Sequence, residues 1–135
     1  MKAQAGGFFY TMQLLYIFLG GGLGALLRYG AALAAGSRCG SALPGTLAVN
    51  VLGSLVLGFV FGLVQHRPGC VSEELRLFIS TGLLGALTTF STLNWEVFSL
   101  LKSGRAACGL SYLALSCVLG LASAAGGYYL AKQVC

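Results

Sequence analysis

Four long apolar stretches, separated by short polar connectors, dominate this 135-residue chain. The stretches cover residues 14–35, 43–64, 77–101 and 107–131, and each reaches the roughly 20 residues that a membrane-spanning helix needs. The connectors at 36–42, 65–76 and 102–106 are short, so consecutive helices should run antiparallel. The pattern predicts an all-α integral membrane protein in which residues 1–135 form a single domain of four transmembrane helices.

The third stretch departs from a plain membrane helix in its middle. Residues 82–94 contain two glycines and five Thr, Ser or Asn residues. Backbone that leaves helical hydrogen bonding at bilayer depth is tolerated only where it is buried in protein or lines a cavity. Broken helices at the midplane build ion sites, because freed carbonyls bind cations and freed amides bind anions. We therefore predict that the third helix is broken at the bilayer midplane and that the protein handles an ion.

The composition excludes other classes of protein. Of all residues, 57% are hydrophobic and 8% are charged, against about 25% charged in soluble domains. The spans and connectors use nearly the whole chain, and no nucleophile–base pair or metal cluster is apparent, so the chain should not be an enzyme. The net charge of +5 is scattered, which favours contact with anionic lipid headgroups of the cell membrane over nucleic acid.

The charges in the connectors barely specify an orientation. Outside the spans, one side of the membrane would carry Lys2, Arg67, Arg76 and Lys132, and the other side Arg38, Lys102 and Arg105. A fixed topology needs an asymmetry of Lys and Arg. Near balance is expected for a chain that inserts both ways, and two opposite copies can pair about a twofold axis in the membrane plane. The pattern favours this dual-topology, antiparallel dimer, with an orientation fixed by a margin of one charge as the alternative.

Polar residues form stripes on two of the spans. Thr46, Asn50 and Ser54 recur every four residues in the second span and so share one helical face. A buried Asn is costly unless its amide finds partners. The stripe is interpreted either as a hydrogen-bonding track along a narrow wet path or as polar contacts between helices. Tyr112 and Ser116 repeat the spacing in the fourth span, where helix packing is the commoner reason.

The first and third spans each hold one charge. Arg28 follows a glycine cluster at 20–24 that predicts close helix packing, and we expect Arg28 to have a structural role at the interface or on a group of carbonyls. Glu96 lies late in the third span, where it would face a vestibule or pair with a basic residue.

Three runs together carry a family resemblance: GGGLGALLRY at 20–29, GTLAVN at 45–50 and GALTTFST at 85–92. With them, the chain resembles the Fluc (CrcB-type) fluoride channel family, over all four spans in order. The resemblance implies a fluoride-selective passive channel that exports fluoride, built as an antiparallel homodimer with two pores and a central structural sodium ion.

The same resemblance implies roles for particular residues. The backbone carbonyls of Gly85 and Thr88 would hold the sodium ion. Residues near or along the fluoride pathway would be Thr46, Asn50, Phe90, Ser91, Thr92, Glu96, Tyr112 and Ser116.

The chain differs from the family at one position, where Leu93 replaces a second Phe. A ring offers an electropositive edge to an anion, and Leu offers none. The donors that remain are mostly neutral amides and hydroxyls, which suit rapid passage because binding must stay weak enough to release the ion.

Two other functions stay open. A small dual-topology exporter that exchanges protons for an organic cation would use Glu96 as its carboxylate. The other is a non-conducting partner subunit of a heteromeric channel, which fits the departure at Leu93 if the chain works with a different partner subunit. Ion flux through the purified protein alone separates the three.

Overall fold

The computed structural model describes the backbone of residues 2–134 and the side chains of residues 10–134. This part of the chain is built from helices and contains no strand. The elements are α1 (Lys2–Cys39), α2 (Leu43–His66), α3 (Glu73–Arg76), the π-helix η1 (Leu77–Leu84), α4 (Gly85–Leu87), α5 (Phe90–Lys102) and α6 (Ala106–Val134). The expected all-helical fold is confirmed.

Four helical segments of the described residues are long and apolar enough to cross a membrane. They are Tyr10–Cys39, Leu43–His66, Glu73–Lys102 and Ala106–Val134. The third of these combines α3, η1, α4 and α5. Tight connectors join the spans, with glycines in the left-handed region at Gly40 and Gly104, where other residues would be strained.

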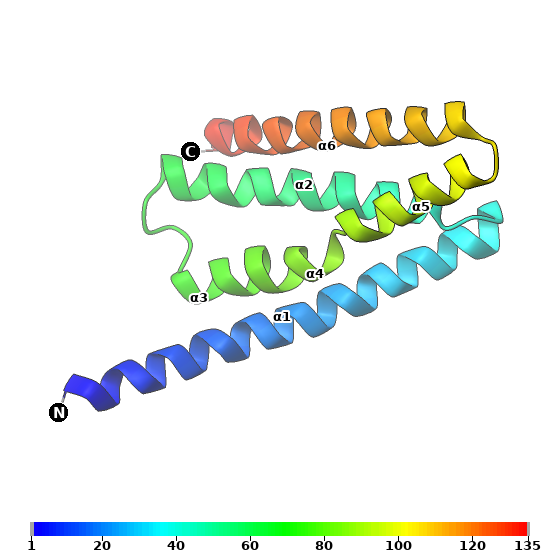
Figure 1. The fold of residues 1–135 in the computed structure, drawn as a ribbon. Coiled ribbons are helices and arrows are strands. Elements are labelled where there is room, and N and C mark those ends of the chain that lie inside the picture. Colours follow the sequence, from blue (N-terminus) through cyan, green and yellow to red (C-terminus); the bar gives the residue numbers. More distant parts are fainter. Residues whose placement is uncertain (1, 135) are drawn as a thin grey trace.

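In Figure 1 α6 lies beside α2 along its length, and the third span lies beside α1, which also packs directly on α2. The third span changes neighbours along its length. Its first part, η1 and α4, packs mainly on α1, whereas α5 packs mainly on α6. The change falls at Thr88 and Thr89, which belong to no helix. The third span therefore leads from one side of the molecule to the other.

Small residues allow the backbones to approach closely. A Cβ atom added to Gly20 would collide with the carbonyl oxygen of Phe78, and one added to Gly24 would collide with that of Leu83. Gly22, on another face of α1, meets nothing within 4 Å. The glycine cluster of the first span thus acts in packing against η1, as the sequence predicted.

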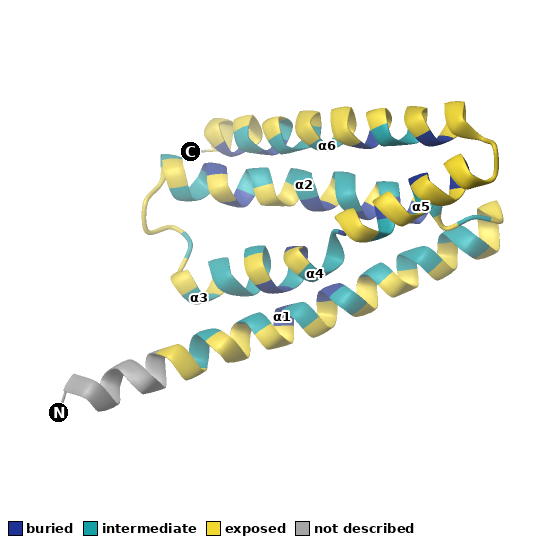
Figure 2. Ribbon diagram, in the orientation of Figure 1, coloured by how far each residue is buried: buried dark blue, intermediate teal, exposed yellow. Residues whose placement is uncertain are grey.

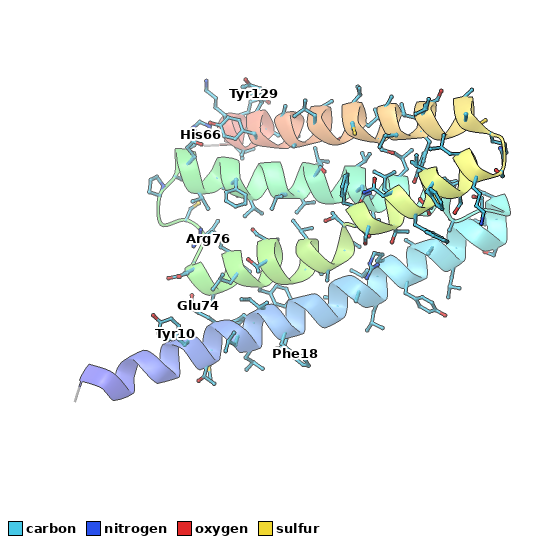
Figure 3. The ribbon with its side chains drawn as sticks, in the orientation of Figure 1. Tyr10, Phe18, His66, Glu74, Arg76 and Tyr129 are labelled. Atoms are coloured by element: carbon cyan, nitrogen blue, oxygen red, sulfur yellow. The ribbon has the colours of Figure 1, made fainter. Side chains whose placement is uncertain are left out.

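The interior of a single chain is small. The buried apolar side chains lie between the helices, and none of the large side chains among residues 10–134 is fully buried. Exposed residues cover the outward faces of the helices (Figure 2), and Phe18 points away from the other helices (Figure 3). Exposed apolar faces of this extent are compatible with lipid, which is as apolar as the side chains themselves.

We expect Gly24→Ala to lower the free energy of unfolding in mixed micelles by about 1–3 kcal/mol, because the added methyl group overpacks the contact with η1. Gly22→Ala is the matched control, because it adds the same methyl group to open space. Equal stability of the two variants would contradict the packing described here.

Candidate functional site

An interruption of the third span lies at Thr88 and Thr89, where the backbone is extended. The backbone angles are φ −79° and ψ 150° at Thr88, and φ −150° and ψ 114° at Thr89. The Thr89 side chain accepts a hydrogen bond of 3.2 Å from the Thr92 N–H. Thr89 is therefore the N-cap of α5, a position that favours a side-chain oxygen.

The side chain of Asn50 on α2 binds this extended backbone at two points. The Thr89 N–H donates to Asn50 Oδ1 at 2.7 Å, and Asn50 Nδ2 donates to the Thr89 carbonyl at 3.1 Å. In a continuous α-helix the Thr89 N–H would bond to the carbonyl of Gly85. The Asn50 amide replaces that bond and leaves the Gly85 carbonyl without this partner.

Two further contacts position the interruption. Arg28 of α1 donates from Nε to the Ala86 carbonyl at 2.9 Å. This bond satisfies one carbonyl near the end of α4. Gly53 on α2 lies against the Thr88 methyl group so closely that a Cβ atom would overlap it. Arg28 thus binds a carbonyl in this structure, one of the two positions expected for it.

A second polar cluster lies one turn of α2 from Asn50, around the carboxylate of Glu96. Thr46 Oγ1 donates to Glu96 Oε1 at 2.8 Å, and the Tyr112 hydroxyl donates to Oε2 at 2.8 Å. The carbonyl of Leu43 is a more distant acceptor for the Tyr112 hydroxyl, at 3.2 Å. Glu96 is therefore held by hydroxyls from α2 and α6 rather than by a basic side chain.

The remaining hydroxyls of this region mostly bond to nearby backbone or to one another. Ser54 and Ser116 donate to the carbonyls of Asn50 and Tyr112, respectively, in their own helices. Thr89 Oγ1 donates to Thr92 Oγ1 at 3.0 Å and lies 3.3 Å from Ser91 Oγ.

Two pockets meet at Thr89. One, of about 260 Å³, is lined by residues that include Asn50, Ser54, Gly85 and Phe90. The other, of about 240 Å³, includes Arg28, Thr46 and Thr92. Phe90 is 70% exposed and Leu93 is 5% exposed, so the aromatic ring lies on the surface of the first pocket and the Leu side chain does not.

Ser80 belongs to the first pocket and was not predicted from the sequence. Its Oγ is buried and has no hydrogen-bond partner among the described residues. It lies in η1, and π-helices frequently occur at functional sites. A single Ser in the otherwise apolar run 77–80 was the available signal.

Apolar spans and an internal line of hydrogen-bonding side chains define a multi-pass membrane protein with a polar track between its helices. Comparison with known proteins identifies the family. Residues 15–128 match the family described as CrcB-like protein, Camphor Resistance (CrcB), and the chain belongs to it. The resemblance seen in the sequence is confirmed.

Relatives named fluoride-specific ion channel FluC cover most of this chain. That of Bacteroides fragilis is 42% identical over 125 residues, which span 90% of this chain and 97% of the relative. That of Chloroflexus aurantiacus is 46% identical over 110 residues, with coverage of 81% and 86%. That of Salinibacter ruber is 45% identical over 117 residues, with coverage of 86% of both. The chain is thus a multi-pass cell-membrane protein of a transport family and not an enzyme.

We expect Thr89→Val to lower the free energy of unfolding by about 0.5–2 kcal/mol, the usual cost of losing an N-cap oxygen. Thr89→Ser keeps the oxygen and should retain most of the stability. Both variants keep the backbone atoms that bind Asn50. If thermal unfolding in detergent does not distinguish them, the hydroxyl of Thr89 does not stabilise the start of α5.

Proposed function

We propose that this chain is the subunit of a passive, fluoride-selective channel that exports fluoride across the cell membrane. The observation that carries the proposal is the line of amide and hydroxyl groups that α2, α5 and α6 bring together, from Asn50 to Thr46 and Tyr112. The family membership and the names of the relatives support the same function.

The chemistry of the track suits a small, strongly hydrated anion. Moving such an ion out of water is costly unless other donors replace its hydration shell. Asn50 has a second amide hydrogen beyond the one that binds Thr89, and it lines the same pocket as the Phe90 ring. Neutral donors and a ring edge stabilise the ion without holding it as tightly as Lys or Arg would.

The position of the Glu96 carboxylate determines whether an anion can bind at the second cluster. In this structure the hydroxyl hydrogens of Thr46 and Tyr112 point to its carboxylate. For fluoride to take those donors, the carboxylate has to move away, because two negative charges cannot share them without strong repulsion. The proposed pathway therefore runs past Phe90 and Asn50, and then past Thr46 and Tyr112, with Ser91, Thr92 and Ser116 on its margins.

We further propose that two copies pair in opposite orientations to form the two pores. Phe90 is exposed in the single chain, and a partner would enclose its ring. The interruption at Thr88 and Thr89 lies near the middle of the span Glu73–Lys102, which would place it at the bilayer midplane. Labelling of Cys70 by a membrane-impermeant thiol reagent, applied to each side of sealed membranes, tests the orientation; labelling from one side alone would reject it.

We also propose a structural sodium ion at the end of α4. Gly85 is exposed, and its carbonyl lacks the Thr89 N–H as a partner. The backbone is extended at Thr88, whose carbonyl is the second proposed ligand. Carbonyl oxygens are hard ligands that suit a hard cation. Two opposite copies would bring two such pairs of oxygens to one twofold axis.

The purified protein in liposomes should release fluoride passively and release chloride hardly at all, as measured with ion-selective electrodes. Protein-free liposomes give the background. Proton-coupled uptake of an organic cation without fluoride efflux would support the exporter that uses Glu96. No flux of either kind would support the non-conducting subunit.

Phe90→Ile should reduce the initial rate of fluoride efflux about tenfold, because it removes a ring edge that lowers the barrier by roughly 1.4 kcal/mol. Leu93→Phe should leave the rate unchanged or raise it. Asn50→Ala should also reduce the rate, because it removes a donor to the ion and also the two hydrogen bonds that hold the Thr89 backbone, each worth about 1–3 kcal/mol. Efflux of the parent and the three variants is compared at equal protein density, after each variant has been shown to form a dimer. Parent-like conduction by Phe90→Ile would mean that hydroxyls and amides alone serve the ion.

Replacing sodium by N-methylglucamine in all buffers should lower the thermal stability of the dimer, because a bound ion stabilises the state that binds it. Potassium should restore less stability than sodium does. A melting temperature independent of sodium would argue against the proposed ion at Gly85 and Thr88.

A further inference from the structure

A pocket separate from the polar track lies between α1 and the start of the third span. Its volume is about 590 Å³, larger than that of either pocket at Thr89. We propose that it binds phosphatidylethanolamine, with the ammonium headgroup on the carboxylate of Glu74 and the upper part of an acyl chain along the apolar wall.

The apolar wall comes from two helical faces. Met12, Tyr16 and Leu19 line the pocket from α1, and their spacing places them on one face of that helix. Leu75 and Phe78 line it from α3 and η1. Tyr16 is 38% exposed, Leu19 52% and Leu75 48%. Because these side chains belong to membrane-spanning helices, an acyl chain can reach them from the bilayer.

The polar end of the pocket lies where lipid headgroups are expected. Glu73 is the first residue of the third candidate span, and Glu74 follows it. Figure 3 shows Glu74 and Tyr10 at the same end of the molecule, where α1 and α3 lie side by side. Phe78 follows Glu74 by one helical turn, about 6 Å along the axis. A lipid with its headgroup at Glu74 would therefore have its acyl chain at the level of Phe78.

The two neighbouring carboxylates differ in their partners. Glu73 Oε1 accepts a hydrogen bond of 3.1 Å from Gln13 Nε2. Glu74 is half-buried and lines the pocket, and its carboxylate has no hydrogen bond or ion pair with residues 10–134. The pocket therefore presents one unpaired carboxylate beside an apolar wall, which complements a ligand that has a positively charged donor and an apolar tail.

Phosphatidylethanolamine matches this combination better than lipids with the other common headgroups. Its ammonium group offers a positive charge and three N–H donors to Glu74. A choline headgroup has the charge but no N–H donor, and an anionic headgroup would be repelled by Glu74.

The test is native mass spectrometry of the purified protein with equimolar phosphatidylethanolamine and phosphatidylcholine of identical acyl chains. We expect the ethanolamine lipid to be retained about tenfold over the choline lipid, which corresponds to roughly 1.4 kcal/mol. Glu74→Gln should abolish the preference. Glu73→Gln, which removes the same charge outside the pocket, should keep most of it.

Two further measurements make the test decisive. Stepwise N-methylation of the ethanolamine lipid should retain binding until the last N–H is replaced, because the proposal requires N–H donation. Equal retention of ethanolamine and choline lipids by the parent, or an unchanged preference in Glu74→Gln, would overturn it. Efficient disulfide formation between two copies of Leu75→Cys in membranes would overturn it as well, since a second copy would then cover the pocket.

Discussion

The two hydrogen bonds between the Asn50 amide and the Thr89 backbone are the contact on which the polar site depends. Where a helix is interrupted inside a membrane, an N–H and a carbonyl lose their helical partners, and each costs several kcal/mol if left unsatisfied. Asn is suited to this position because one side chain offers both an acceptor and a donor. An Asp could only accept, and a Leu could do neither.

The geometry of the third span follows from this contact. With the backbone extended at Thr88 and Thr89, the chain leaves α1 and continues along α6. This change of direction brings Glu96 within hydrogen-bond reach of both Thr46 and Tyr112. In a continuous helix the Thr89 N–H would bond to the Gly85 carbonyl, so that carbonyl would not be free and Thr89 would not bind Asn50. The polar cluster and the freed carbonyl thus share one cause, which links the proposed anion pathway to the proposed sodium site.

Close backbone packing complements the interruption. Gly53 lets α2 lie directly against Thr88, and Gly20 and Gly24 let α1 lie directly against η1. Within a bilayer, apolar burial does not drive helices together, so contact at short range and hydrogen bonds have to supply the attraction. The exposed outer faces leave extensive apolar surface for lipid or for another copy of the chain. The pocket beside Glu74 is one place where that apolar surface also carries a charge.

Local sequence patterns are enough to assign the class of structure. Apolar runs of membrane length and short connectors required four helical spans, because backbone in lipid must satisfy its own hydrogen bonds. The family runs at 20–29, 45–50 and 85–92 were sufficient to identify the family. Periodicity also placed Thr46 and Asn50 on one face of α2. These features depend on local pattern alone.

The hydrogen-bond partners of the polar side chains depend on how the helices pack. The spacing of Asn50 leaves open whether its amide serves a wet path or a helix contact. In the structure the amide oxygen and one amide hydrogen bind the Thr89 backbone. Glu96 was expected at a vestibule or beside a basic residue, and it bonds to hydroxyls from two other helices. Ser80 and the pocket at Glu74 were not foreseen at all. These contacts join residues far apart in the chain, and their geometry depends on how the helices pack, which no single-helix periodicity encodes.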